Sequence, residues 1–456
     1  MNESRLLIII LLLTAWVNSH AVTYSGTLPV LYIETEHRQE ITSKEDYLSG
    51  TYYLDAMGAN DVESIGSKDN PLTLEIKGRG NWTWRGFDKK PYRLKLTEKA
   101  ALMGMNKSKH FALLAHADDN KGFMRNTLGF YLSEQIGMAW TPKAVALELV
   151  LNGDYKGLYF LTETIRVDKD RVNIVEQEDN ETDSENITGG WLVEIDNYRD
   201  DPQICFMEGD TGEEMAITYK TPEELSSAQE QFLRAEMERI DRLVYGDKNS
   251  DELWQYVDMD ALAKFYIVQE ITDNYESFHG SCYLYRDMGE GQKWMFGPVW
   301  DFGSAFNYDK EQYLYEGREW HNHWIPEICK FPKFMDRVKE IWQSFHADGY
   351  AGVYDYASDF ASHIADAAKN DAKRWESQGY GNKDMSYRLE RIHRKLEITE
   401  KWLVKQWGAG TSVNNIYVTD SETIIYTLQG MRTDEMKSGE VYIVRQGTES
   451  KKVLIQ

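Results

Sequence analysis

A single carboxylate stands among apolar residues between Trp294 and Phe306, where the sequence reads Trp-Met-Phe-Gly-Pro-Val-Trp-Asp-Phe-Gly-Ser-Ala-Phe. Asp301 is the one charged residue of this stretch, and Trp300 and Phe302 flank it. We expect its carboxylate to be partly desolvated, and a desolvated charge costs free energy unless a cation or hydrogen-bond donors compensate it. A hard cation with oxygen ligands, such as Mg²⁺, provides that compensation. Asp301 is therefore a candidate metal ligand, although an aspartate that caps a turn at a strand end fits the pattern equally well.

The elements that must position this residue change in kind along the chain. Alternating or short apolar runs predict strands at 30–34, 52–55, 72–77, 91–96, 111–115, 145–151, 155–161 and 190–196. A glycine-punctuated loop is predicted at 78–86, and an Asn152-Gly153 turn is predicted to join the strands at 145–151 and 155–161 into a hairpin. Helical spacing predicts helices at 118–136, 226–245, 259–271, 334–346, 353–368 and 383–407, with a strand hairpin at 281–286 and 294–296 among them. The main body is thus predicted to be α+β, strand-rich first and helix-rich last.

Three segments are predicted from the composition along the chain. Residues 1–21 have the charge, the apolar core and the small-residue end of a secretory signal peptide, so we expect a mature chain that starts near Val22 and has no transmembrane segment. An uncleaved N-terminal anchor is the alternative for the same residues. Residues 22–408 form the main domain. After a glycine-rich linker, residues 412–456 contain only short predicted strands and form a small all-β module. The protein is therefore expected to be secreted, periplasmic or displayed at the cell surface.

The composition excludes several classes of protein. The 456 residues carry a net charge of −24, which disfavours binding to nucleic acid or to anionic lipid. Aromatic residues make up 13%, too many for a disordered chain. The three cysteines, Cys205, Cys282 and Cys329, have no metal-binding spacing and allow at most one disulfide.

Several stretches, in the same order, resemble the spore-coat-protein-H-like (CotH) kinase family over roughly residues 65–310. They are Gly78-Arg-Gly-Asn-Trp-Thr-Trp84 with Lys89-Lys-Pro-Tyr-Arg-Leu-Lys-Leu96, Leu113-Leu-Ala115 with Met124-Arg-Asn126, Leu151-Asn-Gly-Asp-Tyr-Lys-Gly-Leu-Tyr-Phe-Leu-Thr-Glu163, Gly189-Gly-Trp-Leu-Val-Glu-Ile-Asp196, and Glu270-Ile-Thr-Asp-Asn-Tyr-Glu276 through Phe306. Each stretch alone is weak, but the ordered set is specific. The C-terminal module resembles the sorting or secretion modules of Bacteroidetes surface proteins.

The resemblance implies an atypical protein-kinase-like fold that transfers the γ-phosphoryl group of ATP to a Ser or Thr hydroxyl of a protein substrate, with Mg²⁺ or Mn²⁺. Such transfer needs positioning and charge neutralisation rather than covalent chemistry. Arg93 and Lys95 share one face of a predicted strand, and Arg79 lies in a glycine-flanked loop, so all three are candidate phosphate ligands. The resemblance also makes Lys95 a candidate catalytic residue. Glu163 is a candidate partner of Lys95 or a residue near the adenine. Each assignment also has a simpler interpretation. The three cations would be solvated side chains on an open strand face, and Glu163 would be an ordinary carboxylate at a strand end.

The resemblance also places catalytic and metal-binding roles after the helix at 259–271. The family has Asn-x-Asp where this chain has Asn274-Tyr-Glu276, so Glu276 is the candidate catalytic base, with one methylene more than aspartate. Asp301 matches the metal-binding aspartate, and it opens an Asp-Phe-Gly of the kind that holds Mg²⁺ in protein kinases. Asn274 and Ser281 complete the expected metal ligands; Ser281 stands near a position where many relatives carry asparagine.

Two other functions are compatible with the sequence. A non-catalytic relative on the same fold would serve as an interaction protein, having lost turnover through Glu276 and Ser281. A carbohydrate-associated surface protein would use its many Trp and Tyr residues to line a sugar-binding groove, although such residues more often belong to cores and interfaces. The protein substrate and the oligomeric state cannot be predicted from the sequence.

Overall fold

The computed structural model describes residues 24–454 except 60–61, 120, 200, 210, 317–323, 379–383, 411–422, 428–431, 434–435, 440 and 447–448. The predicted signal peptide, residues 1–21, lies outside the described residues. The chain forms two compact units. The first comprises Met1–Phe123, Lys143–Thr164 and Ser358–Glu390, and the second comprises Met124–Pro142, Ile165–Ala357 and Arg391–Gln456.

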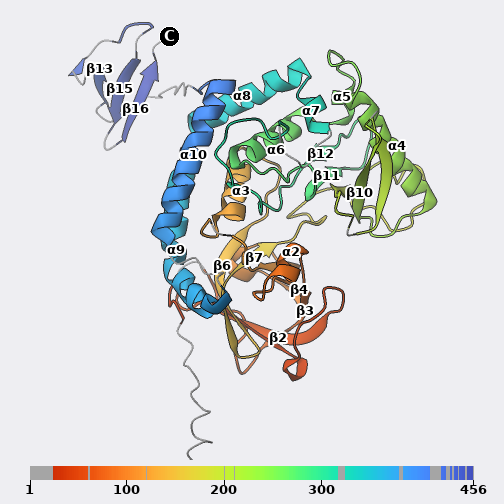
Figure 1. The fold of residues 1–456 in the computed structure, drawn as a ribbon, viewed down its shortest axis with the longest axis vertical. Helices are drawn as coiled ribbons and strands as arrows, with labels where there is room; N and C mark the ends of the chain where they lie inside the picture. The colour runs from red at the N-terminus through yellow and green to blue at the C-terminus, as the bar shows by residue number, and fades with distance from the viewer. Residues whose placement is uncertain are drawn as a thin grey trace, which may run out of the picture. The chain divides into compact units, whose positions relative to one another are not determined.

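The first unit is built on a closed barrel of seven strands in the order β1-β2-β3-β4-β5-β7-β6 (Figure 1). The strands are β1 (Val30–Thr35), β2 (Leu48–Asp55), β3 (Leu72–Gly78), β4 (Tyr92–Ala100), β5 (Ser108–Leu114), β6 (Ala144–Leu151) and β7 (Asp154–Glu163). All neighbouring pairs are antiparallel except β1 and β6, which are parallel and close the barrel. Leu94 and Leu96 of β4 are buried in the barrel core, whereas Arg93 and Lys95 are exposed, as the alternation of the sequence predicts.

Short helical segments complete the barrel. They are the 3₁₀ turns η1 (Glu36–Arg38) and η2 (Leu102–Gly104) and the helix α2 (Trp82–Gly86). The prediction of a plain loop at 78–86 is therefore wrong for its second half, which forms a single helical turn. The predicted Asn-Gly hairpin between β6 and β7 is confirmed, and Asn152 and Gly153 both have positive φ, of 54° and 79°.

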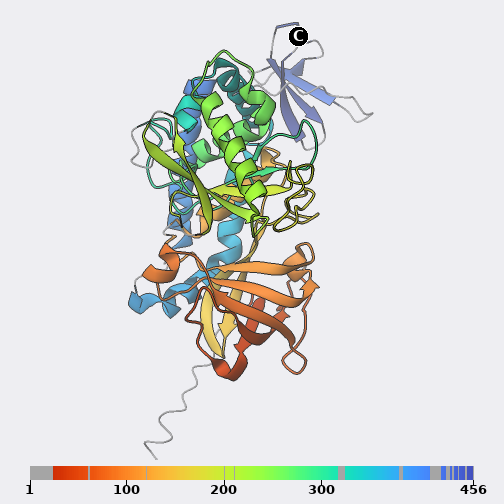
Figure 2. The ribbon, with the colours of Figure 1, turned by 90° about the vertical axis from the view of Figure 1, so that its right-hand side faces the viewer.

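The second unit contains a five-stranded antiparallel sheet in the order β12-β11-β8-β10-β9. Its strands are β8 (Trp191–Ile195), β9 (Gln203–Glu208), β10 (Glu213–Thr221), β11 (Cys282–Arg286) and β12 (Met295–Phe296). The unit also contains the helices α3 (Met124–Gln135), α4 (Ser227–Val244), α5 (Leu253–Tyr256), α6 (Met259–Thr272), α7 (Trp324–Ile328) and α8 (Pro332–Asp348). Helix α4 packs against β9 (Figure 2).

Two long helices, α9 (Gly352–Arg374) and α10 (Met385–Trp407), contribute residues to both units, and the 3₁₀ turn η3 (Glu376–Gln378) follows α9. The helices of the C-terminal half confirm the predicted change from strand-rich to helix-rich structure. Beyond α10, the strands β13 (Thr423–Thr427), β14 (Arg432–Thr433), β15 (Val441–Gln446) and β16 (Glu449–Leu454) form a four-stranded antiparallel sheet.

Two predictions of secondary structure need correction. The helix predicted at 118–136 begins only at Met124, after a loop that includes Phe123 with a positive φ of 64°. The antiparallel hairpin of β9 and β10 was not predicted. Within the part of the chain that the structure describes, no helix combines the length and the apolar character needed to span a membrane.

Candidate active site at the end of helix α6

Helix α6 ends in a turn that carries two of the predicted site residues. The helix is buried along most of its length, and Asp258 caps its start by accepting a hydrogen bond from the Ala261 amide at 2.9 Å. At its other end Asp273 adopts a left-handed conformation with φ 49°, and its amide donates back to the carbonyls of the last helical turn. Asn274 and Glu276 follow at once. The helix end therefore fixes where these two side chains start.

A buried cation holds this helix end. The Lys310 ammonium contacts the Glu270 carboxylate and lies 3.0 Å from Oδ1 of Asp273. All three side chains are buried. Burial raises the pKa of Glu270 above its ordinary value, and the charge of Lys310 opposes that rise. Lys310 thus forms ion pairs with both carboxylates that precede Asn274.

Asn274 joins the helix end to the segment that contains Asp301. Its Nδ2 donates to Oε1 of Gln269 at 3.0 Å and to the backbone carbonyl of Asp301 at 3.1 Å. Its Oδ1 is buried and accepts no hydrogen bond from any part of the chain that the structure describes. Rotating the amide by 180° would place that oxygen against two acceptors, so the assignment of the two atoms is fixed by the network. A buried amide oxygen in this situation suits a metal ion or another donor that the chain does not supply.

Asp301 lies in a tight turn with φ 53°, and its Oδ1 accepts a hydrogen bond from the Gly303 amide at 3.1 Å. The expectation that it is desolvated among aromatic residues is wrong, because its side chain is exposed. The left-handed turn directs the carboxylate outward while Phe302 is fully buried on the opposite side. Phe302 packs so closely on α3 that a Cβ at Gly129 would lie 2.3 Å from its ring.

The first turn of α3 anchors this segment. The Phe302 amide donates to Oδ1 of Asn126 at 2.9 Å. Arg125, which is buried, donates to the carbonyl of Gly303 and to Oδ1 of Asn307, the latter at 2.5 Å. Positive φ in a non-glycine residue such as Asp301 costs on the order of 1 kcal/mol, so the turn needs such support.

Glu276 is held from two sides by hydroxyl groups. The Tyr198 hydroxyl donates to Oε1 of Glu276 at 2.7 Å, and the Ser304 hydroxyl donates to Oε2. Ser304 belongs to the segment that follows Asp301, so Glu276, like Asn274, is bonded to that segment. Tyr198 follows strand β8. Neither Tyr198 nor Ser304 is predicted from the sequence as a site residue. Hydrogen bonds to both oxygens fix the orientation of a carboxylate.

Ser281 is placed differently from the other predicted metal ligands. Its amide donates to Oε1 of Glu194 in strand β8 at 2.9 Å, and its own φ is 54°. Glu194 also contacts Lys220 at 3.1 Å, and burial raises the pKa of Glu194 while Lys220 opposes the rise. The structure therefore connects Ser281 to the sheet by its backbone. Asn274 is the predicted ligand that the structure connects to Asp301.

The donor set fits a magnesium ion only in part. Among the described residues, no group of three or more His, Cys, Asp or Glu side chains is arranged to hold a metal ion. Mg²⁺ is usually bound by one or two carboxylates, with waters and substrate phosphates as its remaining ligands. An exposed Asp301 carboxylate and a buried Asn274 Oδ1 without a donor meet that smaller requirement. The residues present therefore fit a metal ion held jointly with a phosphate ligand.

The predicted nucleotide ligands lie in the first unit. Lys95 pairs with Glu75 on the neighbouring strand β3 at 2.9 Å, with both side chains about half exposed, and Arg93 is exposed on the same face. The amide of Arg79 donates to the carbonyl of Pro91 at 3.2 Å. Glu163 is buried at the end of β7 and accepts a hydrogen bond from the Lys143 amide at 3.1 Å. Glu163 and Lys95 are thus placed in different environments, one buried and one exposed.

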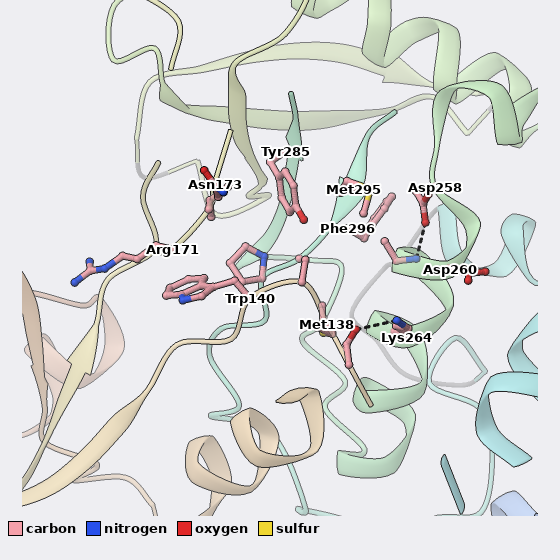
Figure 3. A pocket seen from close by; sticks show the side chains of 16 residues that line it. Met138, Trp140, Arg171, Asn173, Asp258, Asp260, Lys264, Tyr285, Met295 and Phe296 are labelled. Carbon is pink, nitrogen blue, oxygen red and sulfur yellow. Dashed lines mark hydrogen bonds between the residues drawn. The ribbon is translucent and has the colours of Figure 1, made fainter. Parts of the chain in front are cut away.

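A pocket of about 230 Å³ lies in the second unit at the opposite end of α6 (Figure 3). Trp140, Tyr285 and Met295 line it, and Asp258 and Lys264 come from the first half of the helix. Lys264 donates to the carbonyl of Gly137 at 2.8 Å. The fourteen residues of α6 span roughly 20 Å at 1.5 Å per residue. The pocket is therefore separate from the turn that carries Asn274 and Glu276.

Comparison with known proteins identifies the family of the chain. The model of the family described as CotH kinase protein matches residues 76–403. This range covers most of the chain and includes Glu276, Asp301 and the barrel strands from β4 onward. A search of curated proteins finds no match. The chain belongs to the CotH kinase family.

Proposed function

We propose that this member of the CotH kinase family is an atypical protein kinase that transfers the γ-phosphoryl group of ATP to a Ser or Thr hydroxyl of a protein, with Mg²⁺ or Mn²⁺. The proposal includes an atypical protein-kinase-like fold. It assigns Glu276 the role of catalytic base and Asp301 and Asn274 the role of metal ligands. Arg79, Arg93, Lys95 and Glu163 remain the proposed nucleotide ligands.

One observation carries the proposal: the turn after α6 and the segment after Asp301 are bonded to each other through the residues that the chemistry needs. Asn274 donates to the carbonyl of Asp301, and Ser304 donates to Glu276. A carboxylate with both oxygens hydrogen-bonded and a buried amide oxygen without a donor are thereby brought close to an exposed aspartate.

The roles follow from what each side chain can do. Glu276 is oriented by two donors and can accept the proton of an acceptor hydroxyl or hold that hydroxyl by a hydrogen bond. Asp301 and the Oδ1 of Asn274 would hold a divalent cation, which neutralises charge on phosphate oxygens when it is bound. Arg125 and Asn126 keep the Asp301 turn in place. Positioning of this kind accounts for most of the catalysis of phosphoryl transfer.

The test uses the purified chain with ATP and either Mg²⁺ or Mn²⁺. Transfer of phosphate to a generic acceptor protein such as casein is followed by intact mass, and the increase in melting temperature caused by nucleotide plus metal is measured alongside. We expect Asp301→Asn to abolish the metal-dependent part of that increase and to lower transfer by at least about 100-fold, the effect of losing a catalytic electrostatic interaction. Asp251→Asn is the matched control, because Asp251 is an exposed aspartate that pairs only weakly with exposed Lys333 in the same unit.

The result that contradicts the assignment is an equal increase in melting temperature for Asp301→Asn and the wild type. Nucleotide binding without any phosphate transfer would instead favour the non-catalytic interaction protein. That alternative rests on Ser281, whose backbone is tied to Glu194 at the position where the sequence leads us to expect a metal ligand. The variant Glu276→Asp further distinguishes a weakened kinase from a non-catalytic protein. Restoring the aspartate of the family raises phosphate transfer only if the longer glutamate has weakened the base.

A carbohydrate-associated function is the second candidate, and the pocket at the start of α6 favours it. Trp140 and Tyr285 are partly exposed there, and the polar side chains of Asp258 and Lys264 line the same pocket (Figure 3). An increase in melting temperature with oligosaccharides that is lost in Trp140→Ala would support this function, and no increase would remove it. Secretion by a cleaved signal peptide before Val22, and a sorting role for residues 412–456 of the Bacteroidetes type, are part of the first proposal.

A further inference from the structure

Tyr198 is placed where an acceptor hydroxyl would have to be. We propose that Tyr198 is a site of phosphorylation within the same molecule, with its hydroxyl as the acceptor and Glu276 as the base. The inference rests on the kinase activity proposed above and extends it in two ways, to an internal substrate and from Ser or Thr hydroxyls to a tyrosine hydroxyl. Its starting point is the distance of 2.7 Å between the Tyr198 hydroxyl and Oε1 of Glu276. A general base must lie within about 2.6–3.2 Å of the oxygen whose proton it accepts.

The position of the Tyr198 ring is fixed by its surroundings. The Tyr198 amide donates to Oδ1 of Asp196 at 3.1 Å, which fixes the backbone in a turn. The ring meets the edge of His279 at a centroid distance of 4.9 Å. It also lies against Gly280, where a Cβ would come within 2.8 Å of two ring carbons. The absence of a side chain at Gly280 is therefore what allows the ring to approach Glu276.

Exposure distinguishes Tyr198 from the other hydroxyl on Glu276. The Ser304 hydroxyl also donates to Glu276, but Ser304 is only 7% exposed, so a phosphoryl group has no room at its oxygen. Tyr198 is 47% exposed. We assign Ser304 to orienting the base and Tyr198 to accepting the phosphoryl group. Asp301 lies near enough for its charge to raise the pKa of Tyr198, after the larger effects of burial and of the bond to Glu276.

The chemistry balances with a nucleoside triphosphate as the co-reactant. The Tyr198 oxygen forms a bond to the γ-phosphorus while the bond from that phosphorus to the β,γ-bridging oxygen breaks, and the nucleoside diphosphate leaves. Glu276 accepts the phenolic proton and returns it to solvent. A phenol whose pKa is raised is a weak nucleophile, but a loose transition state depends little on the nucleophile and strongly on its position. The 2.7 Å contact supplies that position.

The experiment incubates the purified full chain with ATP and Mg²⁺ or Mn²⁺ and locates phosphate by mass spectrometry of peptides. We expect phosphotyrosine at residue 198, formed with a first-order rate constant that stays the same over a tenfold range of protein concentration. Tyr198→Phe should lose this phosphate. Tyr387→Phe, which removes the hydroxyl of a tyrosine of similar exposure (48%), should retain it. Gly280→Ala keeps the Tyr198 hydroxyl but displaces the ring, and should reduce the rate constant at least about tenfold, since a small misplacement costs that much or more.

The outcomes separate this inference from the kinase activity on which it rests. Phosphate on casein without phosphate on Tyr198 overturns the inference and leaves the activity standing. No phosphate on any protein, including casein, overturns the kinase proposal itself. A rate constant for Tyr198 that rises in proportion to protein concentration also counts against the inference, because the modification would then occur between molecules.

Discussion

Lys89 in the first unit and Lys310 in the second are both deeply buried, and the two are used differently. In the first unit the Lys89 ammonium lies 2.8 Å from Oδ1 of Asp371 in α9 and donates to the carbonyl of Leu158 at 2.7 Å. In the second unit Lys310 contacts two carboxylates, those of Glu270 and Asp273. The first pair fastens a helix to a barrel strand. The second fixes the residues that immediately precede Asn274 and Glu276.

The charges around the two buried lysines also differ. Burial lowers the pKa of Lys89 and raises the pKa of Asp371, so the environment opposes both charges, and each partner only reduces the effect. Aromatic rings of Phe123 and Tyr159 lie about 5 Å from the Lys89 ammonium and add a favourable contact. Lys310 balances one charge against two. Its removal therefore leaves more uncompensated charge, and leaves it beside the candidate site.

The largest effect is expected for Lys310→Met. Breaking a buried ion pair destabilises a protein by about 3–5 kcal/mol, and two stranded carboxylates place this variant near 5 kcal/mol. Chemical denaturation measures the loss of free energy of unfolding. We also expect the metal-dependent increase in melting temperature with nucleotide to disappear, because the turn after Asp273 loses its anchor. Lys333→Met, which removes an exposed pair with Asp251, should change the free energy of unfolding by less than about 1 kcal/mol.

Lys89→Met should destabilise the protein less, by about 3 kcal/mol, because only Asp371 is stranded and it keeps the hydrogen bond from the Leu158 amide at 3.0 Å. The variant should retain the increase in melting temperature with nucleotide and metal, measured at a temperature where it is folded. Lys95→Met is the control in the same unit, with a half-exposed pair and a loss of less than about 1 kcal/mol. If Lys89→Met loses nucleotide binding as completely as Lys310→Met, the distinction between the two buried lysines is wrong.

Regular periodicity made much of the fold predictable. The alternation in β4 and the Asn-Gly turn after β6 gave strand directions and a hairpin that the structure confirms. The hairpin of β9 and β10 was missed although Ile204 and Phe206 alternate inward, because acidic residues with low strand propensity surround the turn between them. Phe123 shows a different limit of prediction from sequence. Its positive φ marks the end of the loop before α3, and the pattern of apolar residues does not indicate this backbone conformation.

The site was predictable as a set of residues but not as a set of contacts. Asn274 and Asp301 were both proposed as metal ligands from the sequence, and the structure joins them by a hydrogen bond across 27 positions. The partner of Glu276 was not predictable, since Tyr198 lies 78 positions away and a lone tyrosine after a strand carries no signal. The sequence suggests a desolvated Asp301 because aromatic residues flank it in the chain. In the structure the left-handed turn at Asp301 points its side chain away from these aromatic residues.

An exposed ion pair at the other end of α6 can be compared with the buried contacts of Lys310, and its loss is expected to have the smallest effect on stability. Arg337 donates to both oxygens of Asp260, at 2.7 and 2.8 Å, and these bonds lower the pKa of Asp260 below its ordinary 3.8. Both side chains are partly exposed, at 39% and 49%, so solvent screens the pair and its contribution is below about 1 kcal/mol. Unlike the contacts of Lys310, it should depend on salt as well as on pH.

Asp260→Asn should therefore reduce the free energy of unfolding by less than about 1 kcal/mol at pH 7 and low salt. The lowered pKa means that the folded state binds this proton less tightly than the unfolded state, so the contribution is complete above pH 3.8 and is lost as the pH falls through the folded value. The difference between wild type and variant should accordingly vanish in acid and shrink on adding 0.5 M salt, whereas the deficit of Lys310→Met should be insensitive to salt. A difference for Asp260→Asn that persists at low pH and high salt would show that packing at the start of α6, and not the charge of Asp260, is what the substitution disturbs.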